Sequence, residues 1–168
     1  HKYEVIPVFV NDNLELFKLS TKLLVQNSTK EISKLVTKES QISWSDLPQI
    51  CDFVFIGLHG GVGENGAVQG ALEMLGLPYN GSGVFASGLC MDKFKTCEFL
   101  RNAGFDVPYS ILLDKKDWEK EKSNTKNISK YIQTLLGDLK FPLILKPHDD
   151  GCSVFVKKIK TEEELIRE

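Results

Sequence analysis

Two lysines and a turn of small residues have the types and positions that could bind a phosphorylated ligand. Lys146 follows the apolar run Phe141–Leu145. A lysine at the end of a buried strand needs an anion nearby, because stripping water from an ammonium is unfavourable. Lys93 opens a predicted helix and, taken alone, would be interpreted as a surface lysine. The backbone N–H groups of a turn after Lys146 could close over phosphate oxygens, although a plain hairpin turn explains the same residues; the turn consists of Asp150, Gly151, Cys152 and Ser153.

A glycine-rich turn at residues 57–66 is the other candidate site. It reads Gly57-Leu58-His59-Gly60-Gly61-Val62-Gly63-Glu64-Asn65-Gly66 and lies between an apolar run and a helical pattern. Such a turn, at the carboxyl end of a strand and the N-terminus of a helix, favours an anionic ligand. The spacing matches neither G-x-G-x-x-G nor a P-loop, and tight-turn chemistry alone would also explain it. His59 would lie at the strand tip as a hydrogen-bond donor to substrate or as a structural residue.

Strands and helices must position these residues, and the hydrophobic pattern predicts them in alternation. The continuous apolar run at 53–58 predicts a central strand covered on both faces, followed by a helix that ends at Gly76. Further strands are predicted at 3–10 and 107–113, and further helices at 84–90, 92–103 and 127–137. Residues 14–50 fit neither period, and the charged segment 114–130 is interpreted as a solvated excursion.

The end of the chain predicts a small αβ unit. Segments 141–147 and 153–158 are expected to pair as an antiparallel hairpin, and Thr161 with Glu164 forms a capping box that opens a last helix. The whole pattern is that of an α/β chain. We expect residues 1–87 to form a parallel-rich sheet with helices on both faces, and the smaller αβ unit to begin near residue 88.

Composition excludes several classes of function. The 168 residues are 42% hydrophobic and carry a net charge of -2, which provides no basic surface for nucleic acid or an anionic membrane. The apolar runs are far shorter than the roughly 20 residues of a membrane span. The four cysteines form no C-x-x-C pair, which favours reduced thiols and a cytoplasmic location.

Several motifs occur in the order typical of one enzyme family. The run from Leu58 to Gly70 resembles the signature L-H-G-x-x-G-E-D-G-x-x-Q-G of D-alanine–D-alanine ligases. Leu77-Pro78-Tyr79-Asn80-Gly81-Ser82-Gly83-Val84, Ala86-Ser87 and Met91-Asp92-Lys93 are similar to the family's G-I-P-Y-x-G-S-G-V, A-S and M-D-K. Residues 141–147 are similar to its F-P-V-I-V-K-P strand, and residues 149–154 stand where it has R-E-G-S-S-V.

This resemblance implies a fold and a reaction. It implies a Rossmann-like pre-ATP-grasp substrate-binding domain at 1–87, followed at 88–168 by the first part of an ATP-grasp domain. The family uses ATP and Mg²⁺ to phosphorylate the carboxylate of one D-alanine, and a second D-alanine attacks the acylphosphate, giving the dipeptide for peptidoglycan. Catalysis of this kind depends on positioning and charge neutralisation.

The resemblance also implies a role for each candidate residue. Lys93 and Lys146 match the nucleotide-phosphate lysines, and His59 and Glu64 match the substrate-binding positions. The loop over the triphosphate corresponds to Asp150, Gly151, Cys152 and Ser153, of which Cys152 and Ser153 are the catalytic candidates. ATP and D-alanine are the expected partners, a homodimer is also considered, and the Mg²⁺ ligands are expected beyond residue 168.

Three departures from the family pattern leave alternatives open. Asn65 replaces the usual Asp, Cys152 replaces a Ser, and Phe155 replaces a Gly that follows Ser-Val. The family's first strand would precede residue 1, and its phosphoryl-stabilising Arg would follow residue 168. A ligase with another acceptor, such as D-lactate, and a non-catalytic remnant that binds nucleotide or a protein partner therefore remain alternatives.

Overall fold

The structure is a computed structural model that describes residues 2–25, 28–123, 127–149 and 155–168. The chain divides into two compact units, each described here by itself. The first contains His1–Ile56 and Gln69–Gly81, and the second contains Gly57–Val68 and Ser82–Glu168. The division passes through helix α4 (Ala67–Met74). This helix confirms the one predicted before Gly76. The predicted domain boundary near residue 87 stays a prediction.

An antiparallel sheet organises the first unit. It has the order β1-β2-β3, formed by Val8–Val10, Leu16–Lys18 and Gln41–Ile42. The Asn11 side chain closes the turn between β1 and β2, because its oxygen accepts hydrogen bonds from the N–H groups of Asn13 and Glu15 at 3.0 and 2.9 Å. Short helices complete this part of the chain: η1 (Thr21–Val25), α1 (Thr29–Leu35), η2 (Lys38–Ser40), η3 (Trp44–Asp46) and α2 (Leu47–Ile50).

The predicted parallel-rich sheet of residues 1–87 is wrong for the described residues, whose ladders are antiparallel. The predicted central strand at 53–58 is reduced to one parallel bridge, between Val54 and Tyr79. Beyond this bridge the backbone has a side chain as its partner, because the side-chain oxygen of Asn80 accepts a hydrogen bond from the Ile56 N–H at 2.5 Å. Phe55 is 78% exposed, so this run is not covered on both faces. The predicted strand at 3–10 is confirmed only at β1.

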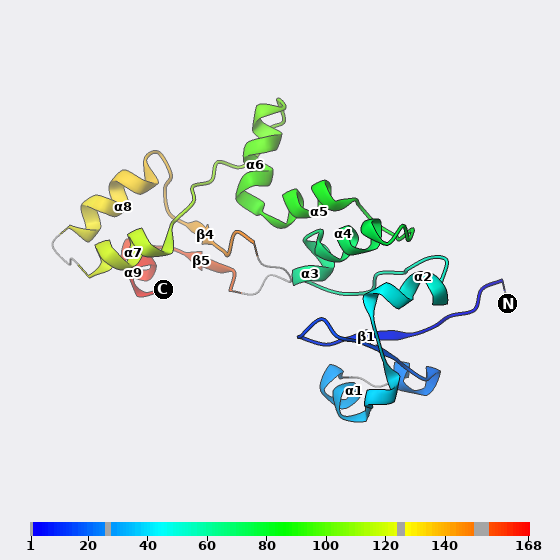
Figure 1. Cartoon of the computed structure of the whole chain (residues 1–168). Helices are drawn as coiled ribbons and strands as arrows, with labels where there is room; N and C mark the ends of the chain where they lie inside the picture. The colour runs from blue at the N-terminus through cyan, green and yellow to red at the C-terminus, as the bar shows by residue number, and fades with distance from the viewer. Residues whose placement is uncertain (1, 26–27, 124–126, 150–154) are drawn as a thin grey trace. The chain divides into compact units, whose positions relative to one another are not determined.

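The second unit carries the helices and the hairpin that the sequence predicted (Figure 1). Helices α5 (Val84–Met91) and α6 (Lys93–Asn102) confirm two predictions, and α8 (Ile128–Leu136) confirms a third. Strands β4 (Leu143–Leu145) and β5 (Lys157–Ile159) pair antiparallel, as predicted for this hairpin. The other helices of the unit are α3 (Gly61–Glu64), α7 (Lys115–Lys122) and α9 (Glu162–Arg167). Thr161 caps α9 through its hydroxyl, which accepts from the Glu164 N–H.

The core of the second unit lies between α8, β5 and α9. Every third or fourth residue of α8 is buried, which is the spacing of one helix face. These residues pack with buried side chains of β5 and α9; the cluster is Ile128, Ile132, Leu136, Ile159 and Leu165.

One expectation for the middle of this unit is wrong. Residues 107–113 form no strand; Pro108 has no N–H to donate to a ladder, and its carbonyl accepts from Arg101. The charged segment contains helix α7, which Asp114 caps by accepting from the N–H groups of Lys116 and Asp117. Trp118 gives α7 an apolar contact, with its ring 6.4 Å from that of Tyr131 on α8. No helix among the described residues is long and apolar enough to span a membrane.

Candidate nucleotide and substrate site

The start of α6 positions Lys93. The preceding residue, Asp92, is the N-cap, and its carboxylate accepts from the Lys95 N–H at 2.9 Å. Thr96 ties the same turn to α5, since its hydroxyl donates to the carbonyl oxygens of Leu89 at 2.6 Å and Asp92 at 2.8 Å. Lys93 therefore lies in a helix turn that is fixed by the Asp92 cap and by the hydrogen bond from Thr96 to α5.

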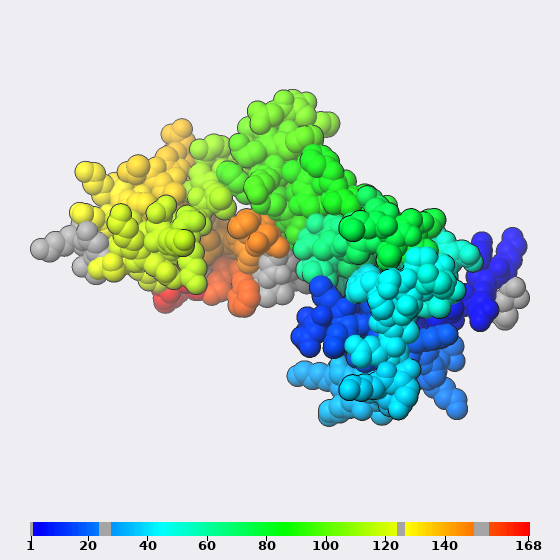
Figure 2. Space-filling view, viewed as in Figure 1, coloured from blue at the N-terminus to red at the C-terminus, as the bar shows by residue number. Residues whose placement is uncertain are grey.

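A main-chain hydrogen bond joins this helix end to the segment after β4. The Lys93 N–H donates to the carbonyl oxygen of His148 at 2.7 Å. In the space-filling view the orange surface of the β4 segment lies against the green surface of α5 and α6 (Figure 2). Because His148 is two residues beyond Lys146, the bond brings together the chain segments of the two lysines.

Side chains strengthen the same contact. The Asp92 carboxylate lies 3.4 Å from Nδ1 of His148 and 3.3 Å from Nζ of Lys95. Burial raises the pKa of Asp92, but hydrogen bonds from Lys95 and the charges of Lys95 and His148 outweigh burial, so its pKa lies below the ordinary value. The carboxylate is therefore ionised at neutral pH, 14% exposed, beside an imidazole that is 46% exposed.

Lys146 keeps its contact with solvent. The expectation that it leaves a buried strand is wrong, since β4 is partly open and Ile144 is 60% exposed. Lys146 itself is exposed. Its ammonium is therefore hydrated and accessible to an anion rather than dependent on one for its position.

The glycine turn forms the single-turn helix α3 and packs on α5. Two backbone N–H groups that could have met an anion are used internally: Gly63 N–H donates to Gly60 O at 3.2 Å, and Asn65 N–H donates to Gly61 O at 3.0 Å. His59 and Glu64 are both exposed. The turn thus presents these two side chains to solvent, while α5 and α6 link it to the lysines.

Two glycines of this turn are required by close approach. A Cβ on Gly63 would lie 2.4 Å from Cβ of Leu58, and one on Gly66 would lie 2.7 Å from the carbonyl oxygen of Val84. Gly66 also has a φ of 94°, in the left-handed region. A side chain at either position would push α3 off its neighbours.

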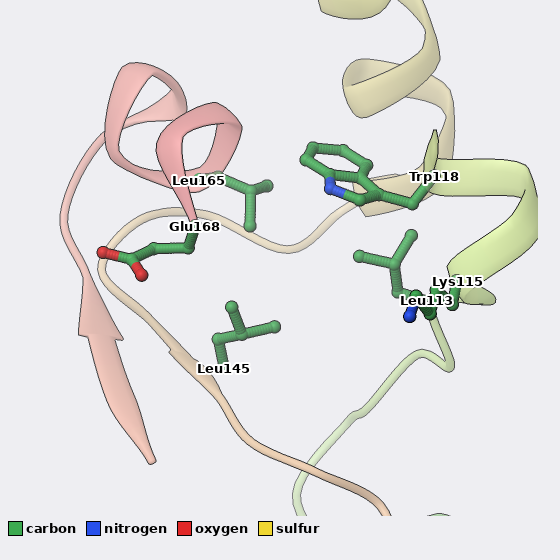
Figure 3. A pocket seen from close by; sticks show the side chains of 6 residues that line it. All are labelled: Leu113, Lys115, Trp118, Leu145, Leu165 and Glu168. Atoms are coloured by element: carbon green, nitrogen blue, oxygen red, sulfur yellow. The ribbon is translucent and has the colours of Figure 1, made fainter. Parts of the chain in front are cut away.

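A separate cavity of about 210 Å³ lies beneath α7 and α9. Leu145, Leu165 and Trp118 point into it, and the Glu168 carboxylate points away toward β5 (Figure 3), where it pairs with Lys157. Its lining is mainly apolar and contains none of the predicted site residues, so it is not a phosphate site.

Comparison with known proteins identifies the family. Residues 1–82 match the family model of the D-ala D-ala ligase N-terminus. A D-alanine–D-alanine ligase of Bacillus anthracis is 34% identical over 99% of this chain, which covers 41% of that protein. The chain belongs to the D-alanine–D-alanine ligase family. It spans about two fifths of the length of the curated relatives that it matches.

Solved structures agree with this assignment and with a mixed α/β fold. The crystal structure of the VanG D-Ala:D-Ser ligase of Enterococcus faecalis superposes with a TM-score of 0.72 at 26% identity, covering 98% of this chain and 48% of that one. The D-alanine–D-alanine ligase of Bacillus anthracis complexed with ATP has a TM-score of 0.50 at 34% identity, over 74% of this chain and 38% of that one. This member of the D-alanine–D-alanine ligase family therefore has the mixed α/β fold of these ligases.

Two of the three departures from the family pattern have a visible structural setting. The Asn65 side-chain oxygen accepts from the Ala67 N–H at 3.0 Å, so the amide caps the start of α4 as a carboxylate would. Phe155 has a φ of 58°, a left-handed conformation that glycine adopts without steric cost. The predicted triphosphate loop, with Asp150, Gly151, Cys152 and Ser153, lies outside the described residues.

Asp92 and His148 were not predicted as site residues from the sequence. Asp92 carried a usable signal, since an Asp directly before a helical pattern is a preferred N-cap. His148 carried none, because its role depends on a partner far away in sequence. Among the described residues no group of three His, Cys, Asp or Glu side chains could hold a metal ion.

Proposed function

We propose that this chain is the N-terminal part of an ATP-dependent ligase that joins two D-alanines into D-alanyl–D-alanine for peptidoglycan. The carrying observation is the 2.7 Å bond from Lys93 N–H to His148 O, which holds the two lysine segments together. Two lysines on adjoining chain segments suit a ligand with several phosphates. ATP, when bound, supplies the phosphoryl group that activates a carboxylate.

Each site residue has a proposed task. Lys93 and Lys146 neutralise phosphate charge, and the loop over the triphosphate consists of Asp150, Gly151, Cys152 and Ser153, of which Cys152 and Ser153 are the catalytic candidates. His59 and Glu64, both exposed on the glycine turn, hold the first D-alanine. We assign Mg²⁺ binding to residues that follow Glu168 in the full-length protein. We place that protein in the cytoplasm and propose that it is a homodimer.

A second acceptor is also supported by one comparison. The VanG protein of Enterococcus faecalis is a D-Ala:D-Ser ligase. The acceptor could thus be D-serine, and D-lactate is a further acceptor to test.

Product analysis of the full-length protein tests the proposal. With ATP, Mg²⁺ and D-alanine we expect ADP, phosphate and D-alanyl–D-alanine in equal amounts. Parallel reactions add D-serine or D-lactate, and a mixed product there assigns a different acceptor. A protein that binds ATP and forms no product with any acceptor would be the non-catalytic remnant instead.

A further inference from the structure

The segment after β4 carries His148, whose side chain faces the start of α6. His148 lies 3.4 Å from the Asp92 carboxylate through Nδ1, and its Nε2 lies 3.8 Å from the carboxylate of Asp149. Lys95 shares the Asp92 carboxylate at 3.3 Å. The imidazole thus lies between two carboxylates, one of which Lys95 also contacts.

The side-chain contact and the main-chain bond act between the same two segments. Asp92 precedes Lys93, whose N–H donates to the carbonyl oxygen of His148 itself. When the imidazole meets the carboxylate, His148 is held from its side chain and from its backbone at once. Both contacts must lengthen together if the strand end leaves the helix.

We infer that Asp92 and His148 are a positioning pair that keeps the Lys93–His148 main-chain bond closed and so sets the spacing of the two lysines for nucleotide phosphate. The inference rests on the proposed function only for its effect on nucleotide binding. Neither residue needs to touch the nucleotide; the pair acts through Lys93 and Lys146.

A double-mutant cycle in the full-length protein measures the pair. Asn is as good an N-cap as Asp, so Asp92→Asn keeps the helix cap and removes the charge that faces His148 and Lys95. His148→Gln removes the imidazole and keeps the backbone carbonyl. For a partly exposed polar contact we expect each variant to weaken ATP binding about two- to fivefold, and the double variant to be no weaker than either one.

A matched control separates the pair from a general effect at the start of α6. Lys95→Ala removes an exposed ammonium that contacts the same carboxylate, and it leaves Asp92, His148 and the main-chain bond of Lys93 with their partners. Its ATP affinity should equal the wild-type value.

Amide hydrogen exchange tests the pair without nucleotide. The Lys93 N–H should exchange about two- to fivefold faster in Asp92→Asn and in His148→Gln than in wild type and Lys95→Ala. Unchanged exchange at Lys93, or additive losses of ATP affinity in the cycle, would overturn the positioning pair. If the wild type does not bind ATP while exchange responds as expected, the proposed function fails and the pair stands.

Discussion

The ammonium of Lys146 is exposed and hydrated, so the fold does not depend on it. A substitution of Lys146 should therefore change the affinity for ATP and leave the stability of the fold unchanged. In the full-length protein we expect Lys146→Met to weaken ATP binding roughly ten- to a hundredfold, the range for losing a hydrogen bond to a charged group. The fold should survive, because Met replaces the apolar stem. Calorimetric titration with ATP gives both affinities.

Lys116 provides the matched control for that substitution. It is an exposed lysine on α7, and its contact with Asp114 uses the backbone N–H, which Lys116→Met retains. Its ATP affinity should equal the wild-type value. Equal affinities for wild type and Lys146→Met would instead make Lys146 a strand-end lysine with no phosphate partner.

Phe155 has a backbone conformation that suits glycine better than phenylalanine. Its φ is 58° and its side chain is 73% exposed, so the ring contributes little burial while its Cβ strains the left-handed backbone. We expect Phe155→Gly to raise the free energy of unfolding by about 0.5–1 kcal/mol. Phe155→Ala keeps the Cβ and should gain nothing. A urea titration in which both variants match would assign the effect to loss of the ring.

At the scale of the element, the cap of α6 makes stability depend on pH. The pKa of Asp92 is lower in the folded protein than its ordinary value, so the ionised carboxylate stabilises the fold above the unfolded-state pKa. That stability is lost as pH falls below about 4, through the folded pKa. Asp92→Asn should show a shallower loss of unfolding free energy between about pH 4 and 2. Equal slopes in acid urea titrations would contradict the shift.

Helix α8 depends on its buried face. Ile132 is 1% exposed at the centre of the cluster with β5 and α9, so Ile132→Ala removes buried methyl groups and leaves a cavity. We expect a loss of about 2–5 kcal/mol in unfolding free energy. Gln133→Ala, one residue along on the exposed face, should stay within about 0.5 kcal/mol. A comparable loss at Gln133 would show that burial of the Ile132 side chain is not what stabilises α8.

Elements with a local signal could be predicted from sequence, and elements that need distant partners could not. Helix α9 was predictable because Thr161 and Glu164 meet within one turn, and α8 because its apolar residues follow a helical period. The run at 53–58 looked like a central strand, yet a strand needs neighbours, and Asn80 satisfies the Ile56 backbone with a side chain instead. In the site, the lysines were predictable by motif, whereas His148 required knowledge of the fold.

At the scale of the whole molecule, the chain spans only about two fifths of its relatives' length. Residues 1–168 alone should give no ATP hydrolysis with D-alanine, because they span only about two fifths of the length of the ligases that they match. The full-length protein should restore turnover in the same coupled assay. Turnover by the 168-residue chain would show that its own residues complete the catalytic machinery.

The bond between Lys93 N–H and His148 O has a consequence for evolution. Both of its atoms belong to the peptide backbone, which every residue except proline supplies at the donor position. The side chain at position 148 can therefore change while the donor and the acceptor of the main-chain bond both remain. Natural selection can thus adjust the strength of the Asp92–His148 contact, and with it the time that the bond stays closed, without removing the bond itself.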